Sequence, residues 1–318
     1  MSAAYDRRVT GERGDRLHSA EFFGPERDHW WNLDQLALIA SRVGLGDVVS
    51  VLDVGCGVGH WGRLLGGVLP GQAQIVGVDR EPSWVCEASA RSERLGLSDR
   101  FRYVEGRAEA LPFPDACFDL VTCQTVLIHV ESPPAVIGEM LRVAKPGAVI
   151  LAAEPNNRAA ALVATSNTAA ASIDELLDEA RFLLICERGK VALGGGDNSV
   201  GDLVPGYFAQ HGVDEIQTFI ADRPAALVPP YASEGQQALR DYVLREAQEG
   251  TVGWIREDAQ RFFIAGGGSA ADFDAAWERR LQGRRLDAQA LRDGTFHTAG
   301  GTILYVVAGR KPATGGTP

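Results

Sequence analysis

The segment VLDVGCGVGHWG at residues 51–62 constrains the fold more than any other part of the chain. It begins within an apolar run, 48–54, whose β-branched residues and glycine boundary are typical of a buried strand. Three glycines follow, and glycine lets a backbone turn sharply and approach a ligand without a Cβ in the way. The helix expected at 61–68 would then offer free N–H groups to a polar ligand. We therefore predict a strand, a ligand-binding turn and a helix.

Further apolar runs repeat this order of strand and helix along the first half of the chain. Segments with helical spacing separate them, and Pro82 and Pro133 stand where helices would begin. Short buried strands that alternate with helices imply parallel pairing with right-handed crossovers. The pattern predicts an α/β fold with a mostly parallel sheet. The expected strands are 48–54, 74–79, 101–106, 117–123, 148–154, 213–221 and 300–310, and the expected helices include 61–68, 82–95, 133–143, 173–186 and 203–211.

The regular alternation stops after Glu154. Two stretches of helical character interrupt the later strands, and the glycine-rich segment 266–270 is expected to be a flexible hinge in the second of them. We predict an N-terminal helical segment at 1–45, a core at 46–155, an insertion at 156–198, a core helix and strand at 199–221, a helical insertion at 222–298, a last core strand at 299–310 and a tail at 311–318.

The composition excludes several classes of protein. A formal net charge of −11 and a pI of about 5.1 disfavour nucleic acid and anionic membranes as partners. The five cysteines are irregularly spaced and form no CxxC pair, so neither a disulfide framework nor a metal site is expected. The N-terminus has no apolar region typical of a signal peptide, and no apolar run reaches the length of a transmembrane helix. We therefore expect a cytoplasmic protein, either a monomer or a homodimer.

Asp79 ends the expected strand that follows the glycine-rich turn. A carboxylate there can accept both hydroxyls of a ribose, because neighbouring strand ends meet at one crevice. Residues 57–62 also spell the GxGxxG pattern of NAD-binding proteins, which leaves a nicotinamide-dependent oxidoreductase as an alternative. The register disfavours that alternative, because a dinucleotide pattern that begins at Gly55 needs a third glycine at the position of His60.

Four ordered motifs resemble the class I S-adenosylmethionine (SAM)-dependent methyltransferases, specifically the broad type 11 group that acts on small molecules. The resemblance implies a seven-stranded Rossmann-like sheet with an antiparallel strand pair at its end, and SAM as the cofactor. The resemblance is weak over 1–45 and almost absent over 155–298, so it does not identify the methyl acceptor. The motifs are VLDVGCGVG (51–59), VGVDREPSWV (76–85), EGRAEALPFPDACFDLVTC (105–123) and LRVAKPGAVILAAEP (141–155).

The resemblance also implies which residues bind the cofactor. Arg107 departs from the family, which usually has aspartate in a Gly-Asp-Ala sequence that recognises the adenine amino group. Arginine cannot accept a hydrogen bond, so the adenine contacts would fall to the Ala108 backbone and Glu109. Cys56 is expected to pack beside the cofactor, and Asp53 to order the glycine turn or reach the methionine amino group. The candidate cofactor-binding residues are Asp53, Gly55, Cys56, Gly57, Asp79, Arg80, Ala108, Glu109, Gln124 and Trp30.

His129 and the neighbouring pair Trp30 and Trp31 are candidates with two interpretations each. Neutral imidazole suits a general base, so His129 is the one catalytic candidate, with a structural role as the alternative. One tryptophan could cover the cationic sulfonium of the methionine group, or could pack the N-terminal helix onto the sheet.

Methyl transfer from a sulfonium is an in-line displacement that chiefly requires alignment of the nucleophile and exclusion of water. We hypothesise that the two insertions form a cap over the carboxyl ends of the strands and that their apolar side chains line a pocket. Those side chains could equally form the core of the cap itself or a dimer face. The leading hypothesis is an enzyme that methylates a small-molecule acceptor. Besides the oxidoreductase, a catalytically silent SAM-binding protein remains an alternative. The pocket candidates are Phe182, Leu183, Leu184, Trp254, Phe262, Phe263 and Trp277.

Overall fold

The chain divides into two compact units. The computed structural model describes residue 27 and residues 29–313, so the polar stretch 1–20, Phe22 and Phe23 lie outside the described residues. Of the described residues, the sheet unit contains 31–160, 190–222 and 302–313, and the helical unit contains 27, 29–30, 161–189 and 223–301.

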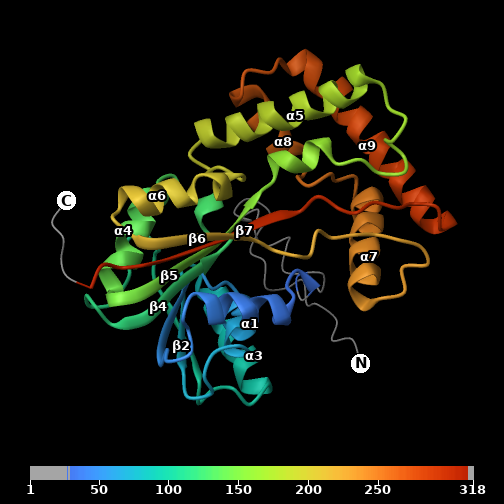
Figure 1. The fold of residues 1–318 in the computed structure, drawn as a ribbon. Coiled ribbons are helices and arrows are strands. Elements are labelled where there is room, and N and C mark those ends of the chain that lie inside the picture. Colours follow the sequence, from blue (N-terminus) through green and yellow to red (C-terminus); the bar gives the residue numbers. More distant parts are fainter. Residues whose placement is uncertain (1–26, 28, 314–318) are drawn as a thin grey trace. The chain divides into compact units, whose positions relative to one another are not determined.

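One seven-stranded sheet, with strand order β3-β2-β1-β4-β5-β7-β6, forms the centre of the sheet unit (Figure 1). Its first five strands pair in parallel, and β7 pairs antiparallel with both β5 and β6. This is the sheet that the sequence predicts, including its antiparallel end. The strands are β1 (Ser50–Val54), β2 (Gln74–Asp79), β3 (Phe101–Glu105), β4 (Phe118–Gln124), β5 (Ala144–Asn156), β6 (Asp214–Ile220) and β7 (Ile303–Arg310).

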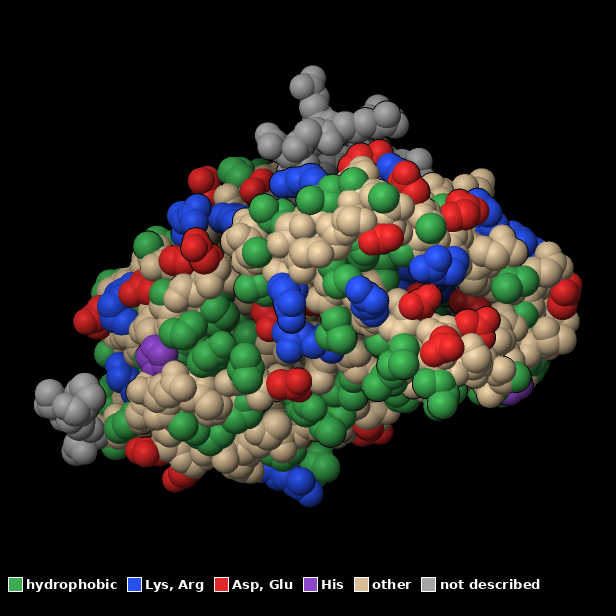
Figure 2. Space-filling view, turned by 90° about the horizontal axis from the view of Figure 1, so that it is seen from above, with side chains coloured by type: hydrophobic (Ala, Val, Ile, Leu, Met, Phe, Trp, Pro, Cys, Tyr) green, Lys and Arg blue, Asp and Glu red, His purple; other side chains and the backbone are tan. Residues whose placement is uncertain are grey.

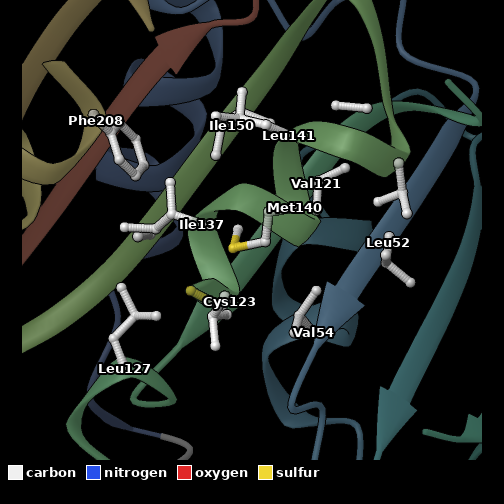
Figure 3. Packing of buried hydrophobic residues seen from close by; sticks show 14 of the residues in the cluster. Leu52, Val54, Val121, Cys123, Leu127, Ile137, Met140, Leu141, Ile150 and Phe208 are labelled. Carbon is white, nitrogen blue, oxygen red and sulfur yellow. The ribbon is translucent and has the colours of Figure 1, made fainter. Parts of the chain in front are cut away.

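Helices cover both faces of this sheet because successive side chains of a strand point to opposite sides. On one face, Leu52 and Val54 of β1 join a buried cluster with α4 (Pro133–Val143) and α6 (Val204–Gln210). Figure 3 shows Ile137 and Met140 of α4 among the side chains of β1, β4 and β5 in this cluster. On the other face, α2 (His60–Gly66) packs so closely that a Cβ on Gly62 would lie 3.3 Å from Ile75 Cγ2.

The remaining helices of the sheet unit begin at recognisable capping residues. In α1 (Leu33–Arg42), Oδ1 of Asn32 accepts a hydrogen bond from the Asp34 N–H at 3.1 Å. In α3 (Pro82–Arg94), proline occupies the first helical position, where no N–H is needed. Within the described residues, the predicted N-terminal helical segment at 1–45 is therefore α-helical only over Leu33–Arg42.

The helical unit has hydrophobic clusters of its own. Phe182 stacks on Phe263 with ring centroids 5.2 Å apart, and Trp254 and Trp277 are buried in the same cluster. These four side chains therefore form the core of the helical unit itself, which is one of the alternatives that the sequence analysis left open for them. Leu184, by contrast, is exposed. The main helices are α5 (Ile173–Ala192), α7 (Glu234–Glu249), α8 (Arg256–Ala265) and α9 (Ala270–Asp293).

The boundaries of the units differ from the predicted domain boundaries. The predicted insertion at 156–198 extends beyond the helical unit, because residues 190–198 belong to the sheet unit. There, Nζ of Lys190 donates to Ile128 O at 2.8 Å. The predicted N-terminal segment at 1–45 differs as well, because its helix α1 belongs to the sheet unit.

The surface mixes charged and apolar side chains. On the face shown in Figure 2, acidic and basic side chains lie among apolar ones, and the visible described residues form no continuous basic area. None of the helices within the described residues combines the length and the apolar character that crossing a lipid bilayer requires.

Candidate functional site

The glycine-rich turn after β1 has a backbone that side chains other than glycine rarely adopt. The φ angles of Gly55, Gly57 and Gly59 are 64°, 51° and 76°. A Cβ on Gly55 would lie 2.5 Å from Val126 Cγ2, so this glycine also permits close packing against the loop after β4. The Gly59 N–H donates to Cys56 O at 2.8 Å, which closes the turn. Glycine is therefore required here for both the bend and the packing.

Asp53 orders the start of helix α2. The helix begins after Gly59, which has no side chain to cap the exposed N–H groups. Oδ2 of Asp53 accepts from the Gly62 N–H at 2.9 Å and supplies that cap from the strand. Asp53 is 1% exposed, so this bond forms away from solvent. The geometry is that of a capping carboxylate for α2, so the two predicted roles, ordering of the glycine turn and a contact with the methionine amino group, stay predictions.

Asp79, at the end of β2, bonds to the same turn. Its Oδ2 accepts from the Gly57 N–H at 2.8 Å, and its Oδ1 accepts from the Glu81 N–H at 3.0 Å. Burial raises the pKa of Asp79, and these two backbone hydrogen bonds act in the opposite direction. An ionised carboxylate has about four lone-pair positions. Each oxygen can therefore still accept one further hydroxyl, as binding of a ribose requires.

The short loop after β3 contains Arg107, the residue that departs from the family's usual Gly-Asp-Ala sequence. The Arg107 guanidinium lies 3.5 Å from Glu109 Oε2, and both side chains are largely exposed. Ala108 packs against the main buried cluster of the sheet unit. Gly106 fits closely, since a Cβ there would lie 2.7 Å from Pro112. Arg107 therefore lies along the surface and pairs with the residue expected to contact adenine.

A tight turn follows Gln124 at the end of β4. Gln124 is 3% exposed, and Thr125 has a φ of 53° and donates its N–H to Ala153 O at 2.9 Å. The short helix η4 (Leu127–His129) then carries His129, which is partly buried. The carboxyl ends of β1, β2 and β4 thus bring the glycine turn, Asp79 and Gln124 to one edge of the sheet.

Glu154 contributes to this edge, although the sequence analysis assigned it no role. Its side chain is fully buried, and its Oε1 accepts from the N–H groups of Val126 at 2.9 Å and Leu127 at 3.1 Å. Burial raises its pKa to about 7. An acidic residue near the end of an apolar strand is the signal that also marks Asp79, so the same argument could have found it.

Lys190 also contacts the loop after β4, and no sequence signal indicated this contact. Nζ of the buried Lys190 donates to Ile128 O at 2.8 Å and to Oδ1 of Asn198. Asp197, in the glycine-rich segment 194–198, bonds to Arg158 and accepts from the Ser199 N–H. This segment is therefore packed within the sheet unit.

Trp31 lies in the sheet unit beside helix α2, whereas Trp30 belongs to the helical unit. The rings of Trp31 and Trp61 have centroids 4.9 Å apart, and Nε1 of Trp61 donates to Thr122 Oγ1 at 2.9 Å. Trp31 is 3% exposed, while Trp30 lies under the Arg27 guanidinium at 5.2 Å. The proposed role of Trp30 in cofactor binding stays a prediction.

Cys56 is suited to packing and unsuited to nucleophilic attack. It is buried, and burial together with the charges of Asp53 and Asp79 raises the pKa of its thiol well above the usual value. Arg80, next to Asp79, is exposed and helps to lower the pKa of that carboxyl. Tyr231 serves packing as well: it is buried and donates its hydroxyl to Phe296 O at 2.8 Å.

Known proteins share both the sequence motifs and the fold. Residues 45–197 match the family model described as a methyltransferase domain. The chain is 36% identical over 111 residues to a sterol 24-C-methyltransferase of Gibberella zeae, covering 35% of this chain and 29% of that protein. It is 30% identical over 140 residues to the ubiquinone/menaquinone biosynthesis C-methyltransferase of Shewanella frigidimarina, covering 44% of this chain and 53% of that protein.

Residues 45–197 therefore resemble the methyltransferase domain of the class I SAM-dependent methyltransferases. A proposed sarcosine dimethylglycine methyltransferase from Galdieria sulphuraria has the same fold, with a TM-score of 0.50 at 19% identity over 89% of this chain and 85% of that one. The chain spans less than a third of the length of the first curated relatives that it matches.

The residues of the turn fit SAM, the cofactor of this family. Gly57, whose φ is 51°, carries no Cβ that would keep an adenosyl group from the backbone of the turn. Asp79 keeps acceptor capacity for the ribose, and the buried neutral thiol of Cys56 offers an uncharged neighbour. The donor set of the turn therefore agrees with SAM, the cofactor of the matched family.

Proposed function

We propose that the protein transfers the methyl group of SAM to a small-molecule acceptor. The observation that carries this proposal is the glycine turn closed by Asp79, within a domain that matches the methyltransferase family. SAM supplies an activated methyl group, so the residues of the chain bind, orient and exclude water.

Each residue of the site has a defined task in this proposal. The Asp79 carboxylate accepts the ribose hydroxyls while its bonds to Gly57 and Glu81 hold it in place. The Asp53 carboxylate fixes the first turn of α2 through Gly62. We propose the backbone of Ala108 and the Glu109 side chain as adenine contacts, and Gln124 as a neighbour of the methionine group.

The comparisons with known proteins do not identify the methyl acceptor. Two matched relatives are named as C-methyltransferases, of a sterol and in quinone biosynthesis. We therefore propose to begin with hydrophobic acceptors whose nucleophile is carbon. His129 remains the candidate general base, and the segments 156–198 and 222–298 remain the candidates for acceptor binding.

Calorimetry tests the cofactor half of the proposal. We expect the full chain to bind S-adenosylhomocysteine and not NADH. Asp79→Asn removes the negative charge from the ribose contacts, and hydrogen bonds to charged groups contribute about 1.5–3 kcal/mol, so affinity should fall roughly 10- to 100-fold. Glu105→Gln is the matched control, since Glu105 pairs with Asp79 on the neighbouring strand and is exposed. Binding of NADH without S-adenosylhomocysteine would overturn the proposal.

Radiolabel transfer tests the catalytic half. Tritium from methyl-labelled SAM should appear in an organic extract with one member of a panel of sterols, quinones and amines. His129→Gln distinguishes the two roles of that histidine, because loss of turnover with unchanged cofactor affinity supports a base. Cofactor binding with no transfer to any panel member would instead favour the catalytically silent alternative.

A further inference from the structure

The loop between β4 and α4 is held from both ends by buried charged side chains. Near its start, Oε1 of Glu154 accepts from the N–H groups of Val126 at 2.9 Å and Leu127 at 3.1 Å. Near its end, Nζ of Lys190 donates to Ile128 O at 2.8 Å. Residues 126–129, which we call the β4 turn, therefore have backbone donors bound by an acidic side chain and a backbone acceptor bound by a basic one.

The side chains of Glu154 and Lys190, which bind the β4 turn, are both deeply buried, and this burial strengthens their hydrogen bonds. Glu154 is 0% and Lys190 is 3% exposed. A buried charged group that lost its hydrogen-bond partner would bear the full desolvation cost, so each group favours the one backbone geometry that satisfies it. Lys190 is further fixed by its bond to Asn198 Oδ1.

The β4 turn also fits tightly between two glycines. On one side, a Cβ on Gly55 of the cofactor turn would lie 2.5 Å from Val126 Cγ2. On the other side, a Cβ on Gly196 would lie 2.3 Å from Ile128 O. The φ of Gly196 is 79°, a conformation that also favours glycine. A displacement of the β4 turn would therefore disturb the cofactor turn or the 190–198 segment.

We propose that Glu154 and Lys190 are positioning residues that fix the β4 turn against the glycine-rich turn and thereby set the place of His129. This inference rests on the proposed function, since His129 matters for methyl transfer only if the chain carries out that reaction. It assigns a role to residues 190–198 of the sheet unit, which hold the β4 turn at the cofactor-binding edge.

Hydrogen exchange of the full chain measures the hold on the β4 turn directly. Lys190→Met keeps the length of the side chain and removes the donor, and Glu154→Leu removes the acceptor. We expect the amides of residues 126–129 to exchange at least tenfold faster in both variants. Glu154→Gln keeps an oxygen at Oε1, so it should preserve slow exchange in the turn.

Lys311→Met is the matched control. Nζ of Lys311 donates to Leu141 O and Ala144 O, both at 2.8 Å, at the opposite end of β5. Its loss removes the same kind of bond between a lysine and backbone carbonyls without touching the β4 turn. We expect a comparable fall in unfolding temperature with no change in exchange at residues 126–129.

The side chain of His129 gives a readout that a purely structural role would not move. Its ring resonance in NMR spectra, assigned with His129→Gln, should shift or broaden in Lys190→Met and stay unchanged in Lys311→Met. Unaltered exchange in the turn and an unmoved ring signal in Lys190→Met would overturn the proposal. Wild-type protein that fails to bind S-adenosylhomocysteine refutes the proposed function instead, while the exchange data still decide whether the turn is held.

Discussion

At the scale of single residues, carboxylates organise the cofactor edge by binding backbone N–H groups. Asp53 bonds to Gly62, Asp79 to Gly57 and Glu81, and Glu154 to the β4 turn. Asp79 and Glu154 each fix the loop that follows a neighbouring strand, whereas Asp53 fixes the helix that follows its own strand. The loops can therefore be irregular and still have one defined geometry.

Glu154 predicts a dependence of stability on pH. Burial raises its pKa from 4.5 to about 7 in the folded state. The folded protein therefore holds this proton more tightly than the unfolded chain, and the contribution to stability is present below pH 4.5 and lost as the pH rises through 7. The free energy of unfolding of wild type minus that of Glu154→Gln should fall by about 3 kcal/mol over this range. Urea denaturation at several pH values measures it, and a flat difference would contradict the burial argument.

We predict that replacing Arg107 by aspartate increases the affinity for the cofactor. Arg107→Asp would place a hydrogen-bond acceptor at the family's usual position and would release Glu109 from its ion pair. We expect S-adenosylhomocysteine to bind about tenfold more tightly, as one added charge-assisted bond would give. Calorimetry measures this, with Arg102→Asp on the exposed side of β3 as the control. An unchanged dissociation constant in Arg107→Asp would contradict this prediction.

At the scale of elements, close helix contacts depend on particular glycines. Gly189 lies in α5, and its backbone contacts α8: a Cβ on Gly189 would lie 1.7 Å from Phe262 O. Gly266 follows α8, and its backbone contacts α5: a Cβ on Gly266 would lie 1.9 Å from Ile185 O. The segment 266–270 was expected to be a flexible hinge. Its first glycine instead permits two helices to approach.

Gly189→Ala should therefore destabilise the helical unit. The added methyl group forces the two helices apart, and such overpacking costs about 1–3 kcal/mol. Gly283→Ala is the control within α9, because a Cβ there meets nothing within 4 Å, and alanine should raise stability by up to about 1 kcal/mol. Urea denaturation of both variants tests the contrast, and equal stabilities would argue against a tight crossing.

The sequence predicted the elements of the sheet unit well, and it predicted their contacts less well. Strand β2 and helix α4 have the predicted bounds, because glycine, proline and apolar runs mark those ends in the sequence itself. The hold of Lys190 on Ile128 was not predictable, because it joins residues 62 positions apart and a lysine is expected at the surface. The packing of Trp31 against Trp61 likewise depends on tertiary structure, which a local pattern does not specify.

At the scale of the whole molecule, two units with separate cores predict separate responses to the cofactor. All the residues proposed to bind it, apart from Trp30, lie in the sheet unit. A ligand that binds only the folded state stabilises it by about 2.7 kcal/mol at 100 times its dissociation constant. We therefore expect S-adenosylhomocysteine to slow hydrogen exchange in the sheet unit and to leave α7 and α9 nearly unchanged. Uniform protection of both units would contradict this expectation.

The place of β7 between β5 and β6 has a consequence for synthesis on the ribosome. Strand β6 ends at Ile220, yet the partner that joins it to the sheet begins only at Ile303. While the intervening residues are being translated, β5 and β6 each present an unpaired edge, and exposed edges invite association between chains. Nascent chains stalled before Ile303 should therefore depend on chaperones more than chains stalled after Arg310.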